Sequence, residues 1–387
     1  MRLFGKKNVS SLKSVDPKKS RKKIIIFIIL GIIVLIGAVA FWKTGGLLNK
    51  ISTEGGIFSS IAKSLPGVDN TLDGESEGRI NILLLGMRGE NVVGGGLLAD
   101  TIMVVSIKPI EKKVSMVSIP RDFYVNVPGE NYSQKINYVY FNGEEKEKNG
   151  GGIKQMKQIV SEISGQPIHY AITINFAGFE QLVDAIGGVK LSLDQSFTEP
   201  MQFHEEKVCD GDKGGVFTVS SGNYEYKKNE RGKIVATYPL CYNSSEECGG
   251  IFTLPAGEQT LDGKKALCYV RSRVTSSDFD RARRQQQVLT EIKKTAFSAS
   301  TLTDFSKIND ILDSLGDNTK TDLEGWEMKK LFDIYRELGD SIVVNQKVLE
   351  NSEEGLLYSH EGDERGYILI PRGDNYDKIK ALFSSII

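Results

Sequence analysis

The sequence has few histidines and a net charge close to zero. Its 387 residues include three histidines, His169, His204 and His360, which is a poor basis for a Ser-His-Asp triad. The formal net charge is -1, so the overall balance implies neither a nucleic acid nor an acidic partner. The glycine-rich stretch VVGGGLLADT contains no G-K-S or G-K-T and no G-x-G-x-x-G that opens a helix, which argues against a nucleotide-binding loop.

The chain also has few cysteines, and none of them shows the C-x-x-C spacing of a zinc site. In an oxidising compartment the four cysteines allow three pairings. We favour a pair among Cys209, Cys241 and Cys248, because these three share one polar, glycine-rich region. Cys268 lies in the apolar pattern ALCYV, and we expect it to pack as a buried thiol.

One long apolar run lies near the N-terminus. Residues 24–42, IIIFIILGIIVLIGAVAFW, are long enough to cross a bilayer as a transmembrane helix. A cleaved signal peptide is disfavoured because Lys43, rather than a small-residue cleavage site, follows the run. Residues 1–23 are rich in lysine and arginine, so the positive-inside rule makes them a cytoplasmic tail. We therefore expect a single-pass cell-membrane protein in which residues 43–78 are an extracytoplasmic linker.

From residue 79 onward, the pattern predicts an α/β, or α+β layered, domain with a central mixed sheet flanked by helices. Nearly continuous apolar runs are typical of strands covered on both faces, and helical periodicity alternates with them. We expect a main domain at 79–300 that carries a surface insertion at about 195–253, and a C-terminal helical extension of the same domain at 301–387. The predicted strands are 79–86, 101–107, 113–120, 168–175, 189–193 and 341–346, and the main predicted helices are 151–165, 176–188, 261–273 and 277–297.

The stretch YVRSRVTSSDFDRARRQQQ, residues 269–287, contains five arginines and no lysine. Ser277 or Asp278 can cap a helix here, and helical spacing places Arg281, Arg284 and Gln285 on one face. Arginine forks match phosphate oxygens, and the N–H groups at a helix start attract anions as well. The alternative is a solvated arginine face, but few acids lie beside it. The sequence therefore predicts a site for one or more phosphates, to which Arg271 and Arg273 contribute from the preceding helix.

A second group of polar residues follows the early strands. Arg121 and Asp122 come directly after a predicted strand, Lys135 follows them, and Asp100 precedes another strand. Because Mg²⁺ takes one or two carboxylates together with substrate phosphate oxygens, Asp100 is a candidate metal ligand beside the arginines. Asp100 as a plain turn or cap residue is the alternative.

These motifs together resemble the LytR-CpsA-Psr family. INILLLG, ADTIMVVSI, SIPRDFYVNVPG with KINYVY, LDGKKALCYVRSR and DFDRARRQQ occur in the family's order, and the resemblance covers residues 79–297. It implies an extracytoplasmic phosphotransferase that moves a glycopolymer, such as wall teichoic acid or capsular polysaccharide, with its phosphate from a polyprenyl-pyrophosphate carrier to peptidoglycan. Such a transfer needs charge neutralisation and positioning more than a covalent nucleophile.

The resemblance also implies roles for individual residues. Asp100 is expected to help bind Mg²⁺, and Asp278 and Gln285 to complete the arginine helix. From the residues themselves, Asp122 and Asp278 are the nearest candidates for a base that accepts the proton of the acceptor hydroxyl. An apolar tunnel is expected to hold the lipid. The residues expected to hold the pyrophosphate are Arg121, Lys135, Arg271, Arg273, Arg281, Arg284 and Gln285, and the candidate tunnel residues are Ile153, Met156, Ile159, Val160, Phe176, Phe179, Leu182 and Val183.

One position departs from the family pattern. Family members usually carry a second metal-binding aspartate two residues after the glycine of the first strand, but here Gly86 is followed by Met87 and Arg88. Glu90 could supply the missing carboxylate, or Asp100 and the substrate could hold the metal alone. The same departure supports the alternative function, a non-catalytic polyprenyl-phosphate binder or attenuator of envelope processes.

Overall fold

The computed structural model describes residues 70–386, and within this range it does not describe 91–95, 200–206, 212–216, 230–231, 244–247, 249–250, 274, 297–310, 312–314, 339–341 and 361–363. The predicted transmembrane segment at 24–42 and most of the predicted linker lie outside the described residues. None of the helices in the described part is long and apolar enough to cross a membrane.

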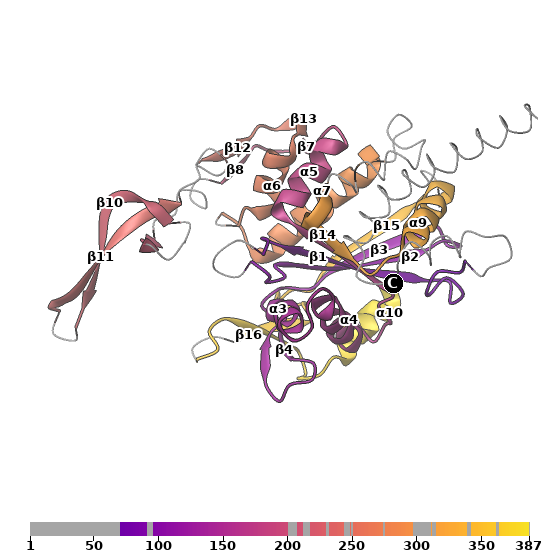
Figure 1. Ribbon diagram of the computed structural model, residues 1–387, viewed down its shortest axis with the longest axis horizontal. Coiled ribbons are helices and arrows are strands. Elements are labelled where there is room, and N and C mark those ends of the chain that lie inside the picture. The colour runs from indigo at the N-terminus through magenta and orange to yellow at the C-terminus, as the bar shows by residue number, and fades with distance from the viewer. Residues whose placement is uncertain are drawn as a thin grey trace, which may run out of the picture. The chain divides into compact units, whose positions relative to one another are not determined.

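A six-stranded mixed sheet forms the centre of the fold, as the sequence predicts, with the strand order β14-β6-β1-β2-β3-β15 (Figure 1). β1 pairs antiparallel with β2 and parallel with β6, β2 pairs antiparallel with β3, β15 lies parallel to β3, and β14 lies antiparallel to β6. The strands are β1 (Ile80–Met87), β2 (Thr101–Lys108), β3 (Lys113–Ser118), β6 (Tyr170–Asn175), β14 (Thr319–Thr321) and β15 (Val343–Val348).

The two edge strands come from the C-terminal segment. Both lie in 301–387, which was expected to be a helical extension with one strand at 341–346; that strand is β15, whereas β14 is not predicted. This segment also contains the hairpin of β16 (Leu357–His360) and β17 (Ile368–Pro371). The C-terminal residues therefore complete the central sheet as well as adding helices to it.

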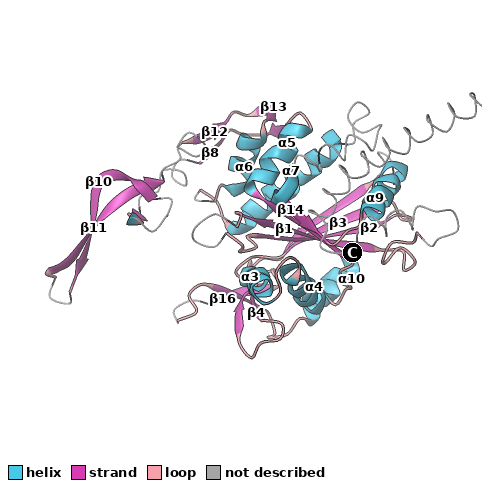
Figure 2. Ribbon diagram, viewed as in Figure 1, coloured by secondary structure: helices cyan, strands magenta, loops and turns pink. Residues whose placement is uncertain are grey.

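Helices cover both faces of the sheet, which gives three layers (Figure 2). On one face the β-strand side chains pack with α3, α4 and α10 in the largest apolar core, and on the other face they pack with α9. The helices α5, α6 and α7 form a further apolar core with the paired strands β7 and β13. These elements are α3 (Asn137–Lys146), α4 (Gly151–Ser164), α5 (Phe176–Ala185), α6 (Gly263–Arg271), α7 (Asp278–Ala296), α9 (Gly325–Leu338), α10 (Asp377–Ile386), β7 (Val189–Leu193) and β13 (Gly257–Leu261).

Several local elements are not predicted by the sequence. One is α3, since the segment NYVYFNGEEK has little helical periodicity. Another is the short hairpin of β4 (Tyr124–Asn126) and β5 (Ser133–Lys135), which lies between Arg121 and α3. A short η3 turn (Gly316–Asn318) precedes β14.

The expected surface insertion consists of strands. β8 (Phe197–Glu199) pairs with β12 (Phe252–Leu254), and between them a long ribbon of β10 (Phe217–Lys228) and β11 (Ile234–Asn243) pairs with the short β9 (Lys207–Val208).

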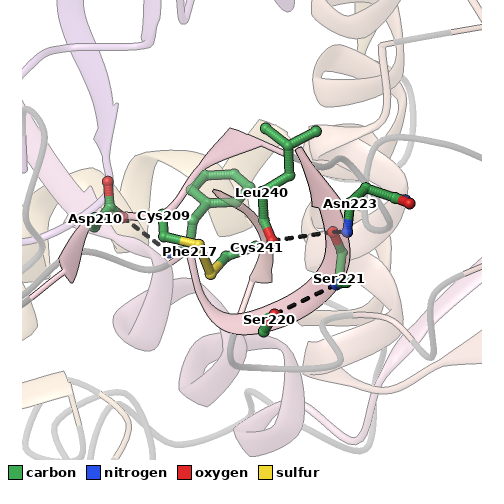
Figure 3. Close-up of a disulfide and its surroundings, with 9 residues drawn as sticks. Cys209, Asp210, Phe217, Ser220, Ser221, Asn223, Leu240 and Cys241 are labelled. Carbon is green, nitrogen blue, oxygen red and sulfur yellow. Dashed lines mark hydrogen bonds between the residues drawn. A yellow bond between two sulfur atoms is a disulfide. The ribbon is translucent and has the colours of Figure 1, made fainter. Parts of the chain in front are cut away.

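Two disulfides secure this insertion. Cys209–Cys241 joins the chain before β10 to β11, within the set of cysteines that the sequence favours (Figure 3). Cys248–Cys268 joins the insertion to α6, so the expectation of a buried thiol at Cys268 is wrong. The apolar pattern around Cys268 correctly indicates burial, since the residue is 3% exposed. A disulfide sulfur packs in an apolar environment as readily as a thiol does, so burial alone does not separate the two states.

Candidate active site

The turn between α6 and α7 is fixed by a helix cap and by a buried arginine. Ser277 Oγ accepts from the N–H of Asp280 at 3.1 Å, and Asp280 Oδ2 accepts from the N–H of Ser277 at 3.0 Å. Arg284 is 8% exposed and donates from Nε to the Tyr269 carbonyl at 3.1 Å and from Nη2 to the Ser272 carbonyl. The sequence predicts Arg284 as a phosphate ligand, but the structure commits these donors to the turn.

Asp278, the first residue of α7, lies at the centre of a group of guanidinium ions. Its Oδ1 is 3.2 Å from Arg281 Nη1 and 3.8 Å from Arg273 Nη1. Its Oδ2 is 3.4 Å from Nε of Arg121, which follows β3. Three of the predicted arginines, from segments far apart in the sequence, therefore converge on one carboxylate at a helix N-terminus.

Arg121 links this group to the second set of predicted residues. Its Nη1 donates to Asp100 Oδ1 at 3.0 Å, and its Nε is 3.5 Å from Asp122 Oδ2. Lys135 Nζ in turn donates to Asp122 Oδ1 at 2.8 Å. The Arg121 Nε–H is buried and has no hydrogen-bond partner among the described residues. Because a buried donor without an acceptor is costly, an oxygen of an anionic ligand would stabilise this site.

The electrostatics of the cluster favour an anion. Burial lowers the pKa of Arg121, but the surrounding carboxylates outweigh that effect and raise its pKa overall. Burial lowers the pKa of Arg281 as well, and the neighbouring arginines lower it further against the attraction of Asp278. Since arginine remains protonated throughout the physiological range, Arg281 carries a buried positive charge that is only partly compensated. Phosphate oxygens would complete that compensation.

Two cavities meet at the cluster. A small one of about 20 Å³ is lined by Asp100, Arg121, Asp278, Arg281 and Gln285, among others. A large one of about 290 Å³ lies between the sheet and the helices α5, α6 and α7, and its lining is mostly apolar. Asp100 and Gln285 line both cavities. A ligand with an apolar chain and a charged head could therefore place its chain in the large cavity and its head beside Asp100 and the arginines of the cluster.

Three of the eight candidate tunnel residues line a cavity. From α5, Phe176, Phe179 and Leu182 line the large cavity. The other candidates are wrong, because α4 covers the opposite face of the sheet and Val183 faces the helical core. A helix that packs in a core and one that lines a cavity have the same apolar periodicity in the sequence. These five fully packed residues are Val183, Ile153, Met156, Ile159 and Val160.

Arg271 lies where the large cavity approaches the charged cluster. Its guanidinium carbon is 4.5 Å from the centre of the Phe176 ring, and both side chains line the cavity. A guanidinium over an aromatic face is held by a cation–π interaction. The arrangement leaves Arg271 beside the entrance to the apolar space, and not within the ring of groups around Asp278.

The two predicted metal ligands have different surroundings. Glu90 Oε1 is 2.7 Å from Lys320 Nζ, so its carboxylate is already ion-paired. Asp100 is held by Arg121, and its Oδ2 is 3.8 Å from Arg88 Nε. No group of three or more acidic, histidine or cysteine side chains that could hold a metal occurs among the residues that the structure describes. Of the two predicted metal ligands, Asp100 lines the cavities and Glu90 does not, and the Asp100 carboxylate already lies beside two guanidinium groups.

The sequence does not identify several residues that shape the site. Gln286 is 2% exposed and donates from Nε2 to Ser118 Oγ at 2.8 Å and to the Lys347 carbonyl at 2.9 Å, which fastens α7 to the sheet. Other cavity residues could have been found from their helical spacing, since they lie three or four positions from Arg271 or from one another on the faces of α6 and α7. They are Leu267, Val270, Leu289 and Ile292.

Comparison with known proteins supports the same interpretation. A teichoic acid transferase from Oceanobacillus iheyensis, polyisoprenyl-teichoic acid–peptidoglycan teichoic acid transferase TagU, is 33% identical over 66% of this chain and 62% of its own length. The Bacillus subtilis transferase TagT is 28% identical over 74% of this chain and 72% of its own length. The Bacillus licheniformis TagU is 26% identical over 90% of this chain and 94% of its own.

Solved structures share the fold. Bacillus subtilis TagV matches with a TM-score of 0.53 and 22% identity over 79% of this chain and 96% of that one. TagT bound to LIIa-WTA matches with a TM-score of 0.51 and 24% identity over 80% of this chain and 91% of that one. The model of the LytR_cpsA_psr family matches residues 59–367, which include the arginine cluster, the residues that line both cavities and all six strands of the central sheet. This chain therefore belongs to the LytR-CpsA-Psr family.

Proposed function

We propose that the protein is a membrane-anchored, extracytoplasmic phosphotransferase. It moves a teichoic-acid or capsule-type glycopolymer, with its phosphate, from a polyprenyl-pyrophosphate carrier to peptidoglycan. The observation that carries this proposal is the position of the arginines around Asp278 beside an apolar cavity of about 290 Å³, with Asp100 and Gln285 lining both that cavity and the small one at the cluster. A lipid pyrophosphate has both kinds of surface in one molecule, and the names of the related transferases agree with that substrate class.

The arginines bind the pyrophosphate and balance its charge. Arg121, Arg281 and Arg273 already share Asp278, so an incoming pyrophosphate competes for guanidinium donors that are held in place. Preorganised donors of this kind stabilise the charge that develops in a phosphoryl transfer at little cost in reorganisation. Arg271 lies at the apolar cavity and is suited to the phosphate nearest the lipid.

The reaction itself exchanges one phosphorus–oxygen bond for another. A hydroxyl group of the peptidoglycan attacks the phosphorus that carries the glycan, and a new P–O bond forms. The bond between this phosphorus and the bridging oxygen breaks, and polyprenyl monophosphate leaves with the electron pair. The hydroxyl proton passes to a carboxylate. Both candidate bases are paired with cations: Asp278, which lines the small cavity, with three arginines, and Asp122 with Lys135 and Arg121.

Mg²⁺ belongs to this proposal as a ligand that arrives with the substrate. Asp100 is the residue that would hold it, since its carboxylate lines both cavities and Glu90 lines neither. The ion would share the Asp100 carboxylate with Arg121. The ion would supply additional positive charge to the phosphate oxygens. Arg88, close to Asp100, contributes positive charge at the same place from the protein.

The location of the protein rests on its N-terminal sequence. The apolar run at 24–42 and the basic residues before it support an anchor with a cytoplasmic N-terminus. The disulfides Cys209–Cys241 and Cys248–Cys268 are typical of proteins outside the reducing cytoplasm.

The test is a transfer assay with the full chain in detergent micelles. The protein is mixed with a synthetic polyprenyl-pyrophosphate glycan and peptidoglycan oligomers, with and without Mg²⁺. Phosphodiester-linked product and released polyprenyl monophosphate are both measured, and they are expected to form in equal amounts. Leu289→Trp fills part of the apolar cavity and is expected to weaken transfer from long polyprenyl chains more than from short ones.

A different outcome would favour the alternative function. If the protein binds the lipid pyrophosphate tightly but forms no product with any acceptor or metal concentration, it is a polyprenyl-phosphate binder or attenuator. If Leu289→Trp leaves the dependence on lipid length unchanged, the large cavity does not hold the lipid.

A further inference from the structure

The ribbon formed by β10 and β11 exposes large apolar side chains on both faces. In most sheets at least one face is covered, yet here the exposed fractions range from 39% for Tyr238 to 55% for Val235. Residues paired across the strands point to the same face, so Tyr224 and Tyr226 lie with Pro239 and Thr237, and Tyr238 lies on the other face with Glu225. The five exposed apolar side chains are Tyr224, Tyr226, Ile234, Val235 and Tyr238.

A ribbon of this kind needs support at its base, because an isolated pair of strands is only marginally stable in water. The disulfide Cys209–Cys241 supplies that support, and Ser221 Oγ donates to the Leu240 carbonyl at 3.0 Å beside it (Figure 3). The pairing is also interrupted by bulges near this end. The ribbon is therefore held by its base while its outer half remains uncovered.

Positive charge accompanies the apolar residues. Lys227, Lys228 and Lys233 are exposed near the turn that joins the strands. From residue 222 to residue 239 the sequence has four lysines and arginines against two glutamates, a net charge of +2, whereas the whole chain has a net charge of -1. The excess of positive charge on the ribbon complements an anionic surface.

We propose that the ribbon docks its outer end into the interface of an anionic lipid bilayer. Tyrosine and aliphatic side chains beside lysines are the combination that partitions into the headgroup region. Ile234 and Val235 favour a bilayer over a soluble polyanion as the partner. A polyanion would pair with the lysines but would leave these two adjacent aliphatic side chains in water. The lysine stems can lie along the apolar layer while their ammonium groups reach the lipid phosphates.

Docking would act on the domain through a covalent link. The insertion that carries the ribbon is joined to α6 by Cys248–Cys268, and α6 ends at Arg271. A ribbon held at the bilayer would therefore be tethered covalently to the helix beside the apolar cavity. The proposal concerns membrane contact and does not depend on the transferase reaction.

The test uses the full chain in lipid nanodiscs and a tryptophan placed on the ribbon. The natural tryptophans are Trp42 and Trp326. Their emission is removed by subtracting the spectrum of the unmodified protein from that of the Tyr226→Trp variant. With phosphatidylglycerol nanodiscs, the difference emission is expected to shift to the blue and to be quenched by brominated lipid tails. With phosphatidylcholine nanodiscs, both effects are expected to be smaller.

Three further variants examine the contacts. In the Tyr226→Trp background, Ile234→Ser with Val235→Ser is expected to abolish the quenching, whereas Ile110→Ser, at another exposed aliphatic residue that is 90% exposed, leaves it unchanged. Changing the three exposed lysines to glutamine is expected to lower the ratio of docked to undocked ribbon by about fivefold for each lysine.

Two results would overturn the proposal. The first is a ribbon tryptophan that remains water-exposed and unquenched in every nanodisc. The second is a tryptophan signal that responds only to added soluble poly(glycerol phosphate), with no quenching by lipid, since the ribbon would then be a site for the anionic polymer. Tryptophan emission and quenching are measured without the transfer reaction, so the docking proposal can fail while the proposed function holds, and the reverse.

Discussion

Replacing Arg281 with alanine tests the arginine cluster most directly. Arg281 is 9% exposed and its Nη1 lies 3.2 Å from Asp278 Oδ1. Asp278 also has Arg121 Nε at 3.4 Å and Arg273 Nη1 at 3.8 Å, so its carboxylate keeps two cationic neighbours in the variant. We therefore expect the fold to survive and the main loss to fall on the bound pyrophosphate.

The expected size of that loss follows from the number of donors removed. One preorganised donor to a developing oxyanion is worth about 10²–10³ in rate, and Arg281 supplies one guanidinium to the charged cavity. We expect kcat for glycan transfer to fall by about that factor. Arg281→Lys keeps the charge but loses the planar fork, so it should recover only part of the rate.

The assay compares this variant with Arg283→Ala. Arg283 lies two residues further along the same helix but is half-exposed, and its Nη1 donates to Asp280 Oδ1 at 2.8 Å outside the cluster. Single-turnover transfer and binding of the lipid pyrophosphate are measured for both variants, together with unfolding in urea. The reasoning would be refuted if both variants transferred at equal rates, or if Arg281→Ala lost activity only in proportion to lost folding.

Three other predictions concern the metal, the turn and the pH dependence of stability. Arg88→Asp places a second carboxylate near Asp100, so titration of transfer with Mg²⁺ should show half-maximal activity at a lower concentration; an unchanged titration would exclude a metal at Asp100. Arg284→Ala leaves buried backbone carbonyls of the turn without donors and should lower the free energy of unfolding by about 3 kcal/mol, measured with urea against Arg283→Ala. Burial lowers the pKa of His169, and its Nδ1 accepts a hydrogen bond from the Asn81 N–H at 2.8 Å. As the pH falls, His169 therefore binds a proton in the unfolded chain before it does so in the folded one. The free energy of unfolding should for this reason decrease below about pH 6.5. Urea unfolding across this range should show a weaker pH dependence in His169→Asn, and equal slopes would contradict this account.

The local sequence determines most of the elements around the site. Continuous apolar runs identify β1, β2 and β3, and helical periodicity identifies α4, α5 and α7, because these patterns depend on neighbours within a few residues. The cap of α7 can likewise be assigned from Ser277 and the acids that follow it. The same local information identifies Arg121, Arg273 and Arg281 as a group suited to phosphate, since their side-chain chemistry is independent of the fold.

Tertiary structure decides which of these side chains meet. Arg284 and Arg281 occur on one helix with similar local sequence, yet Arg284 turns into the α6–α7 loop and Arg281 into the charged cavity. The apolar residues of α4 and α5 follow the same period, but they cover opposite faces of the sheet, and only one of those faces has the cavity. Cys268 is buried in either interpretation, and its bond to Cys248 depends on where the insertion returns.

The sequence by itself therefore determined the chemistry available to this protein: an arginine-rich phosphate site, carboxylates beside it, and enough apolar surface for a layered domain. Only the tertiary structure decided that Asp100 and Gln285 lie between a charged cavity and an apolar one. The physical reason is that charge and hydrophobicity belong to each residue, whereas a cavity exists only where packed elements from distant segments fail to fill the space between them.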